Sequence, residues 1–504
     1  MHGGTHGGTN GGTGGGTGGA LRRRSAVVLL AVAQVLVAFD AAAFSMALPW
    51  IQMQYRLSID GLTWLLTAYS VCFAALPVLA VALGGAFGHR KVLLGGLALS
   101  SLAATVSAVT TDPGMLLGSR ALQGVAAAAI TAGALALIDA THPEGRGRDR
   151  ALGVHFAVVA SAAPAVLLPC SMVLETADSG KAVFWAEAGV GLALLLLVPW
   201  ALAESAPRPR ARARLGRAAG AVLPLGLLAW FADWLGDHSV SATTIIVVAV
   251  AGALVPSSLS WFGRGENVPE LFARLYRGRA AFGAYTVVAL LAAGLTGSSF
   301  VLTIALQLLG QMSVVSVGWA LFPAVVGLLL GWLVLPAVAA RAGLGATVAA
   351  ACGVTAAGFF LLTLGGTAYR FSDVLLPLLL IAFGCGVLAL PVSFARSGSG
   401  ALPRGLNSSR QLGAGLGASL FVGVVTVSQQ GLSSPALGGR KAYENSLAAG
   451  FRDCFELGAA LALTAAVVAL LTLPRQGFRT TAPDPAASGG APAGTAGSPG
   501  SSGR

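Results

Sequence analysis

Long apolar runs recur along the whole chain, and they constrain its fold more than any other feature. The 504 residues are 55% hydrophobic and only 10% charged, with a mean hydropathy of +0.79. A soluble domain carries roughly a quarter charged residues. A helix of about 20 apolar residues is long enough to cross the hydrocarbon core of a bilayer. The sequence therefore predicts an all-α polytopic membrane protein rather than a set of soluble domains.

Fourteen of these runs are long enough to be membrane spans. We place the predicted spans near residues 25–48, 62–87, 91–110, 114–139, 151–174, 182–203, 218–236, 240–262, 281–305, 314–339, 344–366, 374–394, 411–429 and 454–473. Two low-complexity cytoplasmic tails flank them and are expected to be disordered. One tail is the Gly/Thr-rich segment 1–24, and the other is the segment 474–504, rich in Pro, Gly, Ser and Ala.

The positions of the basic residues predict how the chain lies in the membrane. Most of the 31 Lys and Arg residues fall in segments that are cytoplasmic if the N-terminus is inside. Cytoplasmic loops carry such an excess. This bias predicts an even number of spans in the cell membrane, with both termini in the cytoplasm. Twelve spans have the same parity and remain an alternative. Because the basic residues lie in short clusters between apolar runs, the net charge of +12 does not indicate a nucleic-acid partner.

Seven short stretches between residues 25 and 473 carry recognisable motifs. They are FDAAAFSMALP (Phe39–Pro49), WLLTAYSVCFAALPV (Trp64–Val78), FGHRKVLLGG (Phe87–Gly96), RALQGVAAA (Arg120–Ala128), PEGRGRDRALGV (Pro143–Val154), ALQLLGQMSVVSVGWALFP (Ala305–Pro323) and SRQLGAGLGASL (Ser409–Leu420). The fourth and sixth stretches are the most specific.

In this order, the stretches resemble the major facilitator superfamily, specifically its fourteen-span drug:proton antiporter branch. The resemblance implies two six-helix halves, residues 25–203 and 281–473, related by pseudo-symmetry. The intervening segment 204–280 would hold a basic loop, two extra central helices and a cytoplasmic linker. The implied activity is multidrug efflux, the proton-coupled export of lipophilic or amphipathic small molecules by alternating access, which confers antibiotic resistance. The implied partners are substrate, protons and the lipid bilayer. A monomer without a cofactor is expected, with the proton gradient as its energy source.

Two departures from the family pattern bear on this function. Gly85 stands where the loop motif between the second and third spans normally carries an acidic residue, although Gly88, Arg90 and Lys91 keep the rest of that conformational-switch loop. The fifth span contains Pro164 and Pro169 but lacks the Gly-Pro motif of antiporters. An uncoupled facilitator or importer of a small metabolite is therefore an alternative.

Other classes of function have little support in the sequence. No nucleotide-binding loop, metal-ligand cluster or catalytic constellation is recognisable, so neither an enzyme nor a metal site is expected. A membrane sensor is a further alternative, but no segment between spans is long enough for a ligand-binding domain.

Asp40, Arg120 and Glu187 are charged residues that lie deep inside predicted spans. Arg120 lies about 9 Å and Asp40 about 12 Å from the outer ends of their spans, at 1.5 Å per helical residue. This similar depth predicts an ion pair, which would make both charges tolerable. Gln123 lies one turn from Arg120 on the same helix face and can bind a partner or substrate. The pair is either a proton-sensitive site facing a central cavity or a static contact that fixes helix packing.

Glu187 lies about 9 Å below the outer interface by the same rise. The family usually has an asparagine there. Glu187 is therefore a candidate second proton carrier or a cation-selecting group, unless its side chain reaches the headgroups or Lys181. Gln307 and Trp332 are candidate cavity-lining residues, and either is equally compatible with simple packing.

Overall fold

A computed structural model describes most of the predicted spans. The described residues are 15–57, 59–141, 146–177, 179–202, 279–365, 369–389 and 435–473, with scattered helical residues between 215 and 222 and between 409 and 425. In this part of the chain, nine helices are long and apolar enough to cross a membrane, and two shorter apolar helices are Trp64–Phe73 and Ala165–Ala177. Nearly all of the predicted seventh and eighth spans and the tail 474–504 lie outside the described residues, so the count of fourteen remains a prediction.

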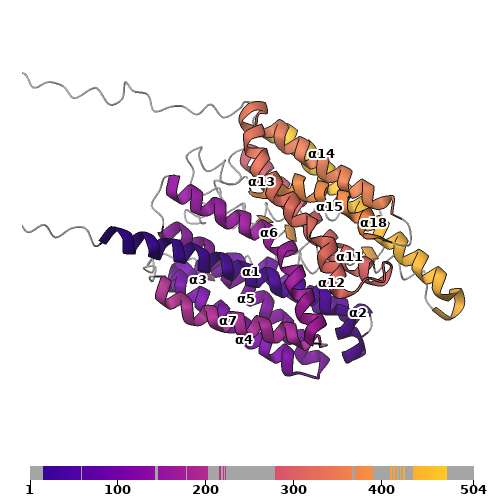
Figure 1. The fold of residues 1–504 in the computed structure, drawn as a ribbon. Helices are drawn as coiled ribbons and strands as arrows, with labels where there is room; N and C mark the ends of the chain where they lie inside the picture. Colours follow the sequence, from indigo (N-terminus) through magenta and orange to yellow (C-terminus); the bar gives the residue numbers. More distant parts are fainter. Residues whose placement is uncertain are drawn as a thin grey trace, which may run out of the picture.

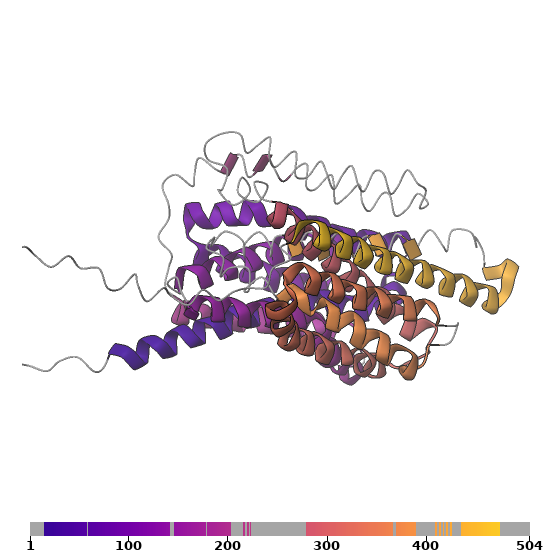
Figure 2. The same cartoon turned by 90° about the horizontal axis from the view of Figure 1, so that it is seen from above.

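The helices form two groups that lie side by side (Figures 1 and 2). The N-terminal group comprises α1 (Gly15–Tyr55), α2 (Ile59–Ala75), α3 (Pro77–Phe87), α4 (His89–Val109), α5 (Pro113–Thr141), α6 (Arg146–Ala177) and α7 (Lys181–Ala201). The C-terminal group comprises α11 (Arg279–Leu308), α12 (Val314–Leu321), α13 (Pro323–Ala342), α14 (Leu344–Thr363), α15 (Phe371–Cys385), the short 3-10 helix η2 (Gly386–Ala389) and α18 (Pro435–Thr472).

Two helices begin earlier than the sequence predicts. The helix α1 starts at Gly15, inside the segment expected to be a disordered tail. Its helical hydrogen bonding continues backwards from the apolar span through Leu21 and three arginines, which are good helix formers. The helix α18 starts at Pro435 rather than near residue 454. Alanine, leucine, lysine and glutamate between residues 436 and 453 favour a helix there, and proline is well tolerated at a first helical position.

Prolines divide the second span of each half into two helices. The predicted span 62–87 is broken at Leu76, between α2 and α3, and the predicted span 314–339 is broken at Phe322, between α12 and α13. Pro77 and Pro323 each follow the break directly. Proline has no amide hydrogen to donate and disfavours a helical conformation of the preceding residue. The helix α6, in contrast, continues across Pro164 and Pro169.

The same turn follows the broken span in both halves. Gly88 joins α3 to α4 with φ 107°, and Gly343 joins α13 to α14 with φ 85°. Each glycine donates its amide hydrogen to a carbonyl four residues earlier, that of Gly84 or of Ala339. A positive φ of this kind is readily adopted only by glycine. Together with the proline breaks, these turns show an internal repeat of the two halves.

The two halves pack against each other mainly through α6. This helix lies against α12 and α13 (Figure 1). It also contacts η2, and α1 contacts α11. A close approach lies at the end of the bundle where α6 ends and α12 begins, which we call the α12 end. A Cβ atom on Gly318 of α12 would lie 3.1 Å from Leu168 Cα of α6. At this end, the Val315 amide also donates a hydrogen bond to the Glu175 carboxylate at 3.3 Å.

Candidate functional site

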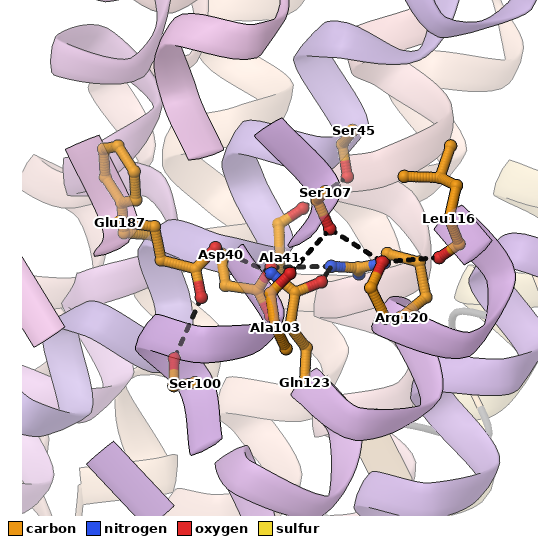
Figure 3. A network of polar contacts seen from close by, with 12 residues as sticks. Asp40, Ala41, Ser45, Ser100, Ala103, Ser107, Leu116, Arg120, Gln123 and Glu187 are labelled. Carbon is orange, nitrogen blue, oxygen red and sulfur yellow. Dashed lines mark hydrogen bonds and ion pairs between the residues drawn. The ribbon is translucent and has the colours of Figure 1, made fainter. Parts of the chain in front are cut away.

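Four polar side chains from three helices meet inside the N-terminal half. Asp40 comes from α1, Arg120 and Gln123 from α5, and Glu187 from α7, and all are between 1% and 4% exposed. Figure 3 shows Glu187 at one side of this cluster and Arg120 at the other, with Asp40 and Gln123 between them. We call these four residues the polar cluster.

Glycines permit close helix packing on two of the helices that carry the polar cluster. A Cβ atom on Gly124 of α5 would collide with the backbone carbonyl of Tyr69 on α2 and would lie 2.9 Å from Cys72 Cβ. A Cβ atom on Gly191 of α7 would collide with Ser101 of α4. Small residues at helix contacts are typical of membrane proteins because they let backbones approach closely. The RALQG motif therefore supplies Arg120 and Gln123 of the polar cluster and also Gly124, which lets α5 pack closely against α2.

Arg120 and Asp40 form a buried ion pair, as their similar depth predicts. Arg120 Nη1 donates to Asp40 Oδ1 at 2.6 Å. The guanidinium also lies against two aromatic rings, with its Cζ atom 4.0 Å from the centre of the Phe44 ring and 4.5 Å from that of Tyr69. A cation over an aromatic face gains about 0.5–2 kcal/mol, more where water is excluded. Arg120 is thus held by one carboxylate and two rings.

Gln123 connects this ion pair to Glu187. Its Oε1 atom accepts a hydrogen bond from Arg120 Nη1 at 2.8 Å, and its Nε2 atom donates one to Glu187 Oε2 at 2.8 Å. The other Glu187 oxygen, Oε1, accepts a hydrogen bond from Ser100 Oγ of α4 at 2.9 Å. One continuous chain of hydrogen bonds therefore runs from Asp40 through Arg120 and Gln123 to Glu187 (Figure 3).

Glu187 does not reach the headgroups or Lys181. Its side chain is 1% exposed, and Lys181 donates instead to the Thr110 carbonyl at 3.4 Å. Ser100, the partner of Glu187, is not predicted from the sequence. A signal for it exists in the pair of serines Ser100–Ser101 within a largely apolar run, because a buried hydroxyl needs a hydrogen-bond partner. Phe44 and Tyr69, the rings against Arg120, were also missed, since aromatic residues are common in spans for packing alone.

The charges of the polar cluster do not balance when every group is ionised. One guanidinium faces two carboxylates, so the fully ionised cluster carries one net negative charge, and one bound proton makes it neutral. An uncompensated charge at the bilayer centre costs roughly 3 kcal/mol on translocon scales. The arrangement can therefore bind and release a proton with a large change in local electrostatic energy.

The remaining predicted site residues lie elsewhere. Arg90 Nη2 donates to the Pro199 carbonyl near the C-terminus of α7 at 3.3 Å, which is a favourable place for a cation. Lys91 is exposed, and Gly88 forms the turn already described. Gln307 on α11 and Trp332 on α13 are both half-buried in the C-terminal half. The structure does not bring either residue into the polar cluster.

No group of three metal-ligating side chains lies close together within the described ranges. The five cysteines, of which Cys72 is half-buried and the other four are buried, are all free thiols.

Comparison with known proteins identifies the family. The sequence model described as "Major Facilitator Superfamily" matches residues 30–422. Among curated proteins, the chain is 30% identical over 289 residues to the puromycin resistance protein pur8 of Streptomyces alboniger, which covers 57% of this chain and 56% of that protein. It is 30% identical to the cephamycin export protein CmcT of Amycolatopsis lactamdurans, over 46% of this chain and 48% of that protein. The chain thus spans about half the length of these curated relatives.

Solved structures agree on the fold. A bacterial homologue of the human drug peptide transporters PepT1 and PepT2 matches 89% of this chain and 98% of its own, with a TM-score of 0.60 and 14% identity. The human organic anion transporter MFSD10 matches 89% of this chain and 99% of its own, with a TM-score of 0.56 and 18% identity. At these identities the likeness concerns the fold alone.

Proposed function

The chain belongs to the Major Facilitator Superfamily, and from this premise we propose that it exports lipophilic or amphipathic small molecules in exchange for protons. The named relatives support the export of drug-like molecules, since one is a puromycin resistance protein and another a cephamycin export protein. We propose that the α12 end faces outside the cell, as the distribution of basic residues predicts.

The unbalanced charge of the polar cluster is the observation that carries the proton-coupled part of this proposal. Intramembrane ionisable residues usually mark ion pathways or proton relays. Here one guanidinium, two carboxylates and a bridging amide are linked by hydrogen bonds of 2.6–2.9 Å and shielded from solvent. A static ion pair needs one carboxylate for one arginine. The second carboxylate has no cation of its own and gives the cluster a place for a proton.

The contact between the two halves is where the conformational change of transport would occur. Alternating access in this architecture is largely a rocking of one half against the other around a fixed site. The halves approach closely at the α12 end, where Gly318 packs against Leu168 and Ser171. Opening this contact exposes the centre of the bundle to one side. Proton binding in the N-terminal half then biases which side is open.

Proton release from inverted membrane vesicles tests the proposal. Vesicles energised by respiration are acidified inside, and a pH-sensitive dye reports the gradient. We expect that adding puromycin, ethidium or tetraphenylphosphonium collapses part of the gradient when the unmodified protein is present. The response is expected to be lost in Arg120→Ala and retained in Arg452→Ala, because Arg452 is an exposed arginine outside the polar cluster.

The opposite result has a defined meaning. No response to any of the three compounds, with the protein confirmed in the membrane, would overturn proton-coupled export. The departures at Gly85 and in the fifth span would then favour the uncoupled facilitator or importer. That alternative predicts downhill, gradient-independent movement of substrate in proteoliposomes.

A further inference from the structure

We propose that Glu187 carries the exchanged proton and that Asp40 stays ionised throughout as the fixed counter-ion of Arg120. This inference rests on the proton-coupled export proposed above, and it identifies which carboxyl group of the polar cluster binds the proton. It assigns the two carboxylates different tasks, although both are buried and belong to one hydrogen-bonded chain.

Asp40 is bound to a full positive charge. Its Oδ1 atom lies 2.6 Å from Arg120 Nη1, and the rings of Phe44 and Tyr69 cover the guanidinium. Protonating Asp40 would remove this anion and leave Arg120 without a directly bound charge in an apolar interior. Removing one partner of a buried ion pair is strongly destabilising because the other charge stays buried and uncompensated. Asp40 is therefore the carboxylate that the fold keeps ionised.

Glu187 accepts hydrogen bonds from two neutral donors, and its side chain also makes a hydrogen-bonding contact with Asp40, another carboxyl group. Ser100 Oγ and Gln123 Nε2 each donate one hydrogen bond to it, at 2.9 Å and 2.8 Å. Losing the Glu187 charge therefore breaks no ion pair. The Ser100 hydroxyl is both a donor and an acceptor, so it can rotate and accept a hydrogen bond from a protonated Glu187 carboxyl. The amide of Gln123 keeps its bond to Arg120 in both states.

The charges around Glu187 favour the same assignment. Among the described residues, the ionisable groups that interact electrostatically with Glu187 are Asp40 of α1, Tyr69 of α2, Arg120 of α5 and Cys170 of α6. Arg120 is the one cation in this set, and Asp40 already neutralises it. Two carboxylates around one arginine leave the more weakly bound of the two to take a proton. With that proton on Glu187, the cluster is neutral and every charged group keeps its partner.

Gln123 gives this proton a way to influence the ion pair. The side-chain oxygen of Gln123 faces Arg120, while its amide nitrogen faces Glu187. When Glu187 is ionised, its negative charge attracts the Gln123 amide and, beyond it, the guanidinium. When Glu187 is protonated, this attraction disappears and Asp40 alone holds Arg120. The proton thus changes how strongly α7 is tied to α5 without breaking the contact between α5 and α1.

Infrared difference spectroscopy on the purified, unliganded protein tests the assignment, with the proton itself as the probe. Solvent-exposed carboxylates are ionised near neutral pH, so the carbonyl stretch of a protonated carboxyl in this range reports a buried acid. We expect such a band to appear as the pH is lowered from the alkaline side. Carbon-13 labelling of glutamate is expected to move the band, and labelling of aspartate to leave it in place. This experiment needs no substitution.

Variants sharpen the test. The band is expected to be absent from Glu187→Gln and present in Glu175→Gln, because Glu175 is an exposed glutamate near the C-terminal end of α6, outside the polar cluster. Ser100→Ala keeps all three charged residues and is expected to move the midpoint pH of the band. A band that moves with labelled aspartate, or that persists in Glu187→Gln, would overturn the assignment.

The vesicle assay separates this inference from the proposed function. Substrate-driven proton release in the unmodified protein is expected to fall more than tenfold in Glu187→Gln while downhill ethidium exchange continues. If the unmodified protein releases no protons, coupled export fails whatever the infrared result. If it releases protons and Glu187→Gln does so equally, coupled export stands and the assignment to Glu187 fails.

Discussion

Replacing Gly318 by alanine should loosen the contact between the two halves at the α12 end. The added Cβ atom would lie 2.5 Å from Ser171 Oγ, 3.1 Å from Leu168 Cα and 3.2 Å from Ser171 Cβ. The serine hydroxyl can rotate away, but the Leu168 Cα belongs to the backbone of α6. Carbon atoms pack best at about 3.5–4.0 Å, so the helices must separate by roughly 0.4 Å or more.

The size of the effect follows from this overlap. Inserting a methylene-sized group into a well-packed contact costs about 1–3 kcal/mol. The cost applies only to the arrangement in which α6 and α12 touch, and it disappears once they separate. Each 1.4 kcal/mol changes an equilibrium constant tenfold. The ratio of protein with α6 and α12 apart to protein with them in contact should therefore rise by about 5-fold to 150-fold.

Distances between two spin labels measure this shift. Labels at Thr176 of α6 and Ser316 of α12, both exposed near the α12 end, report the separation of the halves in a background where Cys72 is replaced by alanine. We expect Gly318→Ala to add weight to the longer distances. Gly353→Ala on α14 is the matched control, because a Cβ atom there meets nothing within 4 Å. An unchanged distribution in Gly318→Ala would refute the reasoning.

Three further predictions concern stability and the same contact. Glu175→Gln weakens the interaction of a carboxylate with the Val315 amide at the start of α12, so the same labels should show a shift worth about 0.3–1 kcal/mol towards opening. Arg120→Ala leaves Asp40 buried without its cation and should lower the free energy of unfolding by about 3–5 kcal/mol, measured as a lower melting temperature in detergent. Adding Asp40→Asn should restore part of this stability. If the effects of the two substitutions simply add, the pairing of Arg120 with Asp40 is contradicted. Gly88→Ala places a side chain at φ 107° and should lower the free energy of unfolding by on the order of 1–3 kcal/mol in the same melting experiment. An unchanged melting temperature would show that alanine is tolerated at this turn.

The fold class and the ion pair could be predicted from the sequence because both follow from counting residues along the chain. Apolar run length identifies spans, and the rise per residue places Asp40 and Arg120 at similar depth. The partner of Glu187 depends on a different kind of information. Ser100 meets Glu187 because α4 packs against α7, and one sequence does not state which helices are neighbours. The aromatic cover of Arg120 depends on helix rotation for the same reason.

The sequence predicts the presence of the helices better than the residues at which they begin and end. A span predicted from hydropathy stops where polarity rises, but the helix continues where the polar residues still favour a helix, as between Pro435 and Phe451 of α18. The breaks at Leu76 and Phe322 had a visible signal in the prolines that follow them. That signal is ambiguous, since α6 accommodates Pro164 and Pro169 without an interruption. Neighbouring helices in a membrane protein can satisfy the backbone groups that a proline frees.

The internal repeat of the two halves does not extend to their buried polar groups. Both halves have a proline break and a positive-φ glycine turn at corresponding places. Among the described residues, however, the hydrogen-bonded group of buried charged side chains, Asp40, Arg120 and Glu187, lies in the N-terminal half. The C-terminal half has buried serine and threonine side chains and two half-buried residues with a buried nitrogen atom, Gln307 and Arg410. Under the proposed function, a proton bound in the polar cluster would act on one half directly and on the other half through the contact between them.

The chain provides a short physical connection for this purpose. Cys170 Sγ of α6 lies 3.9 Å from the Phe39 carbonyl, one residue before the ion-paired Asp40. The next residue of α6, Ser171, is the one that packs against Gly318 of α12. Coupling predicts that the spin-label distances at the α12 end change with pH in the unmodified protein, that Glu187→Gln abolishes this dependence, and that Gly318→Ala keeps it while favouring the open form. A pH dependence that survives in Glu187→Gln would show that the contact between the halves responds to a group other than Glu187.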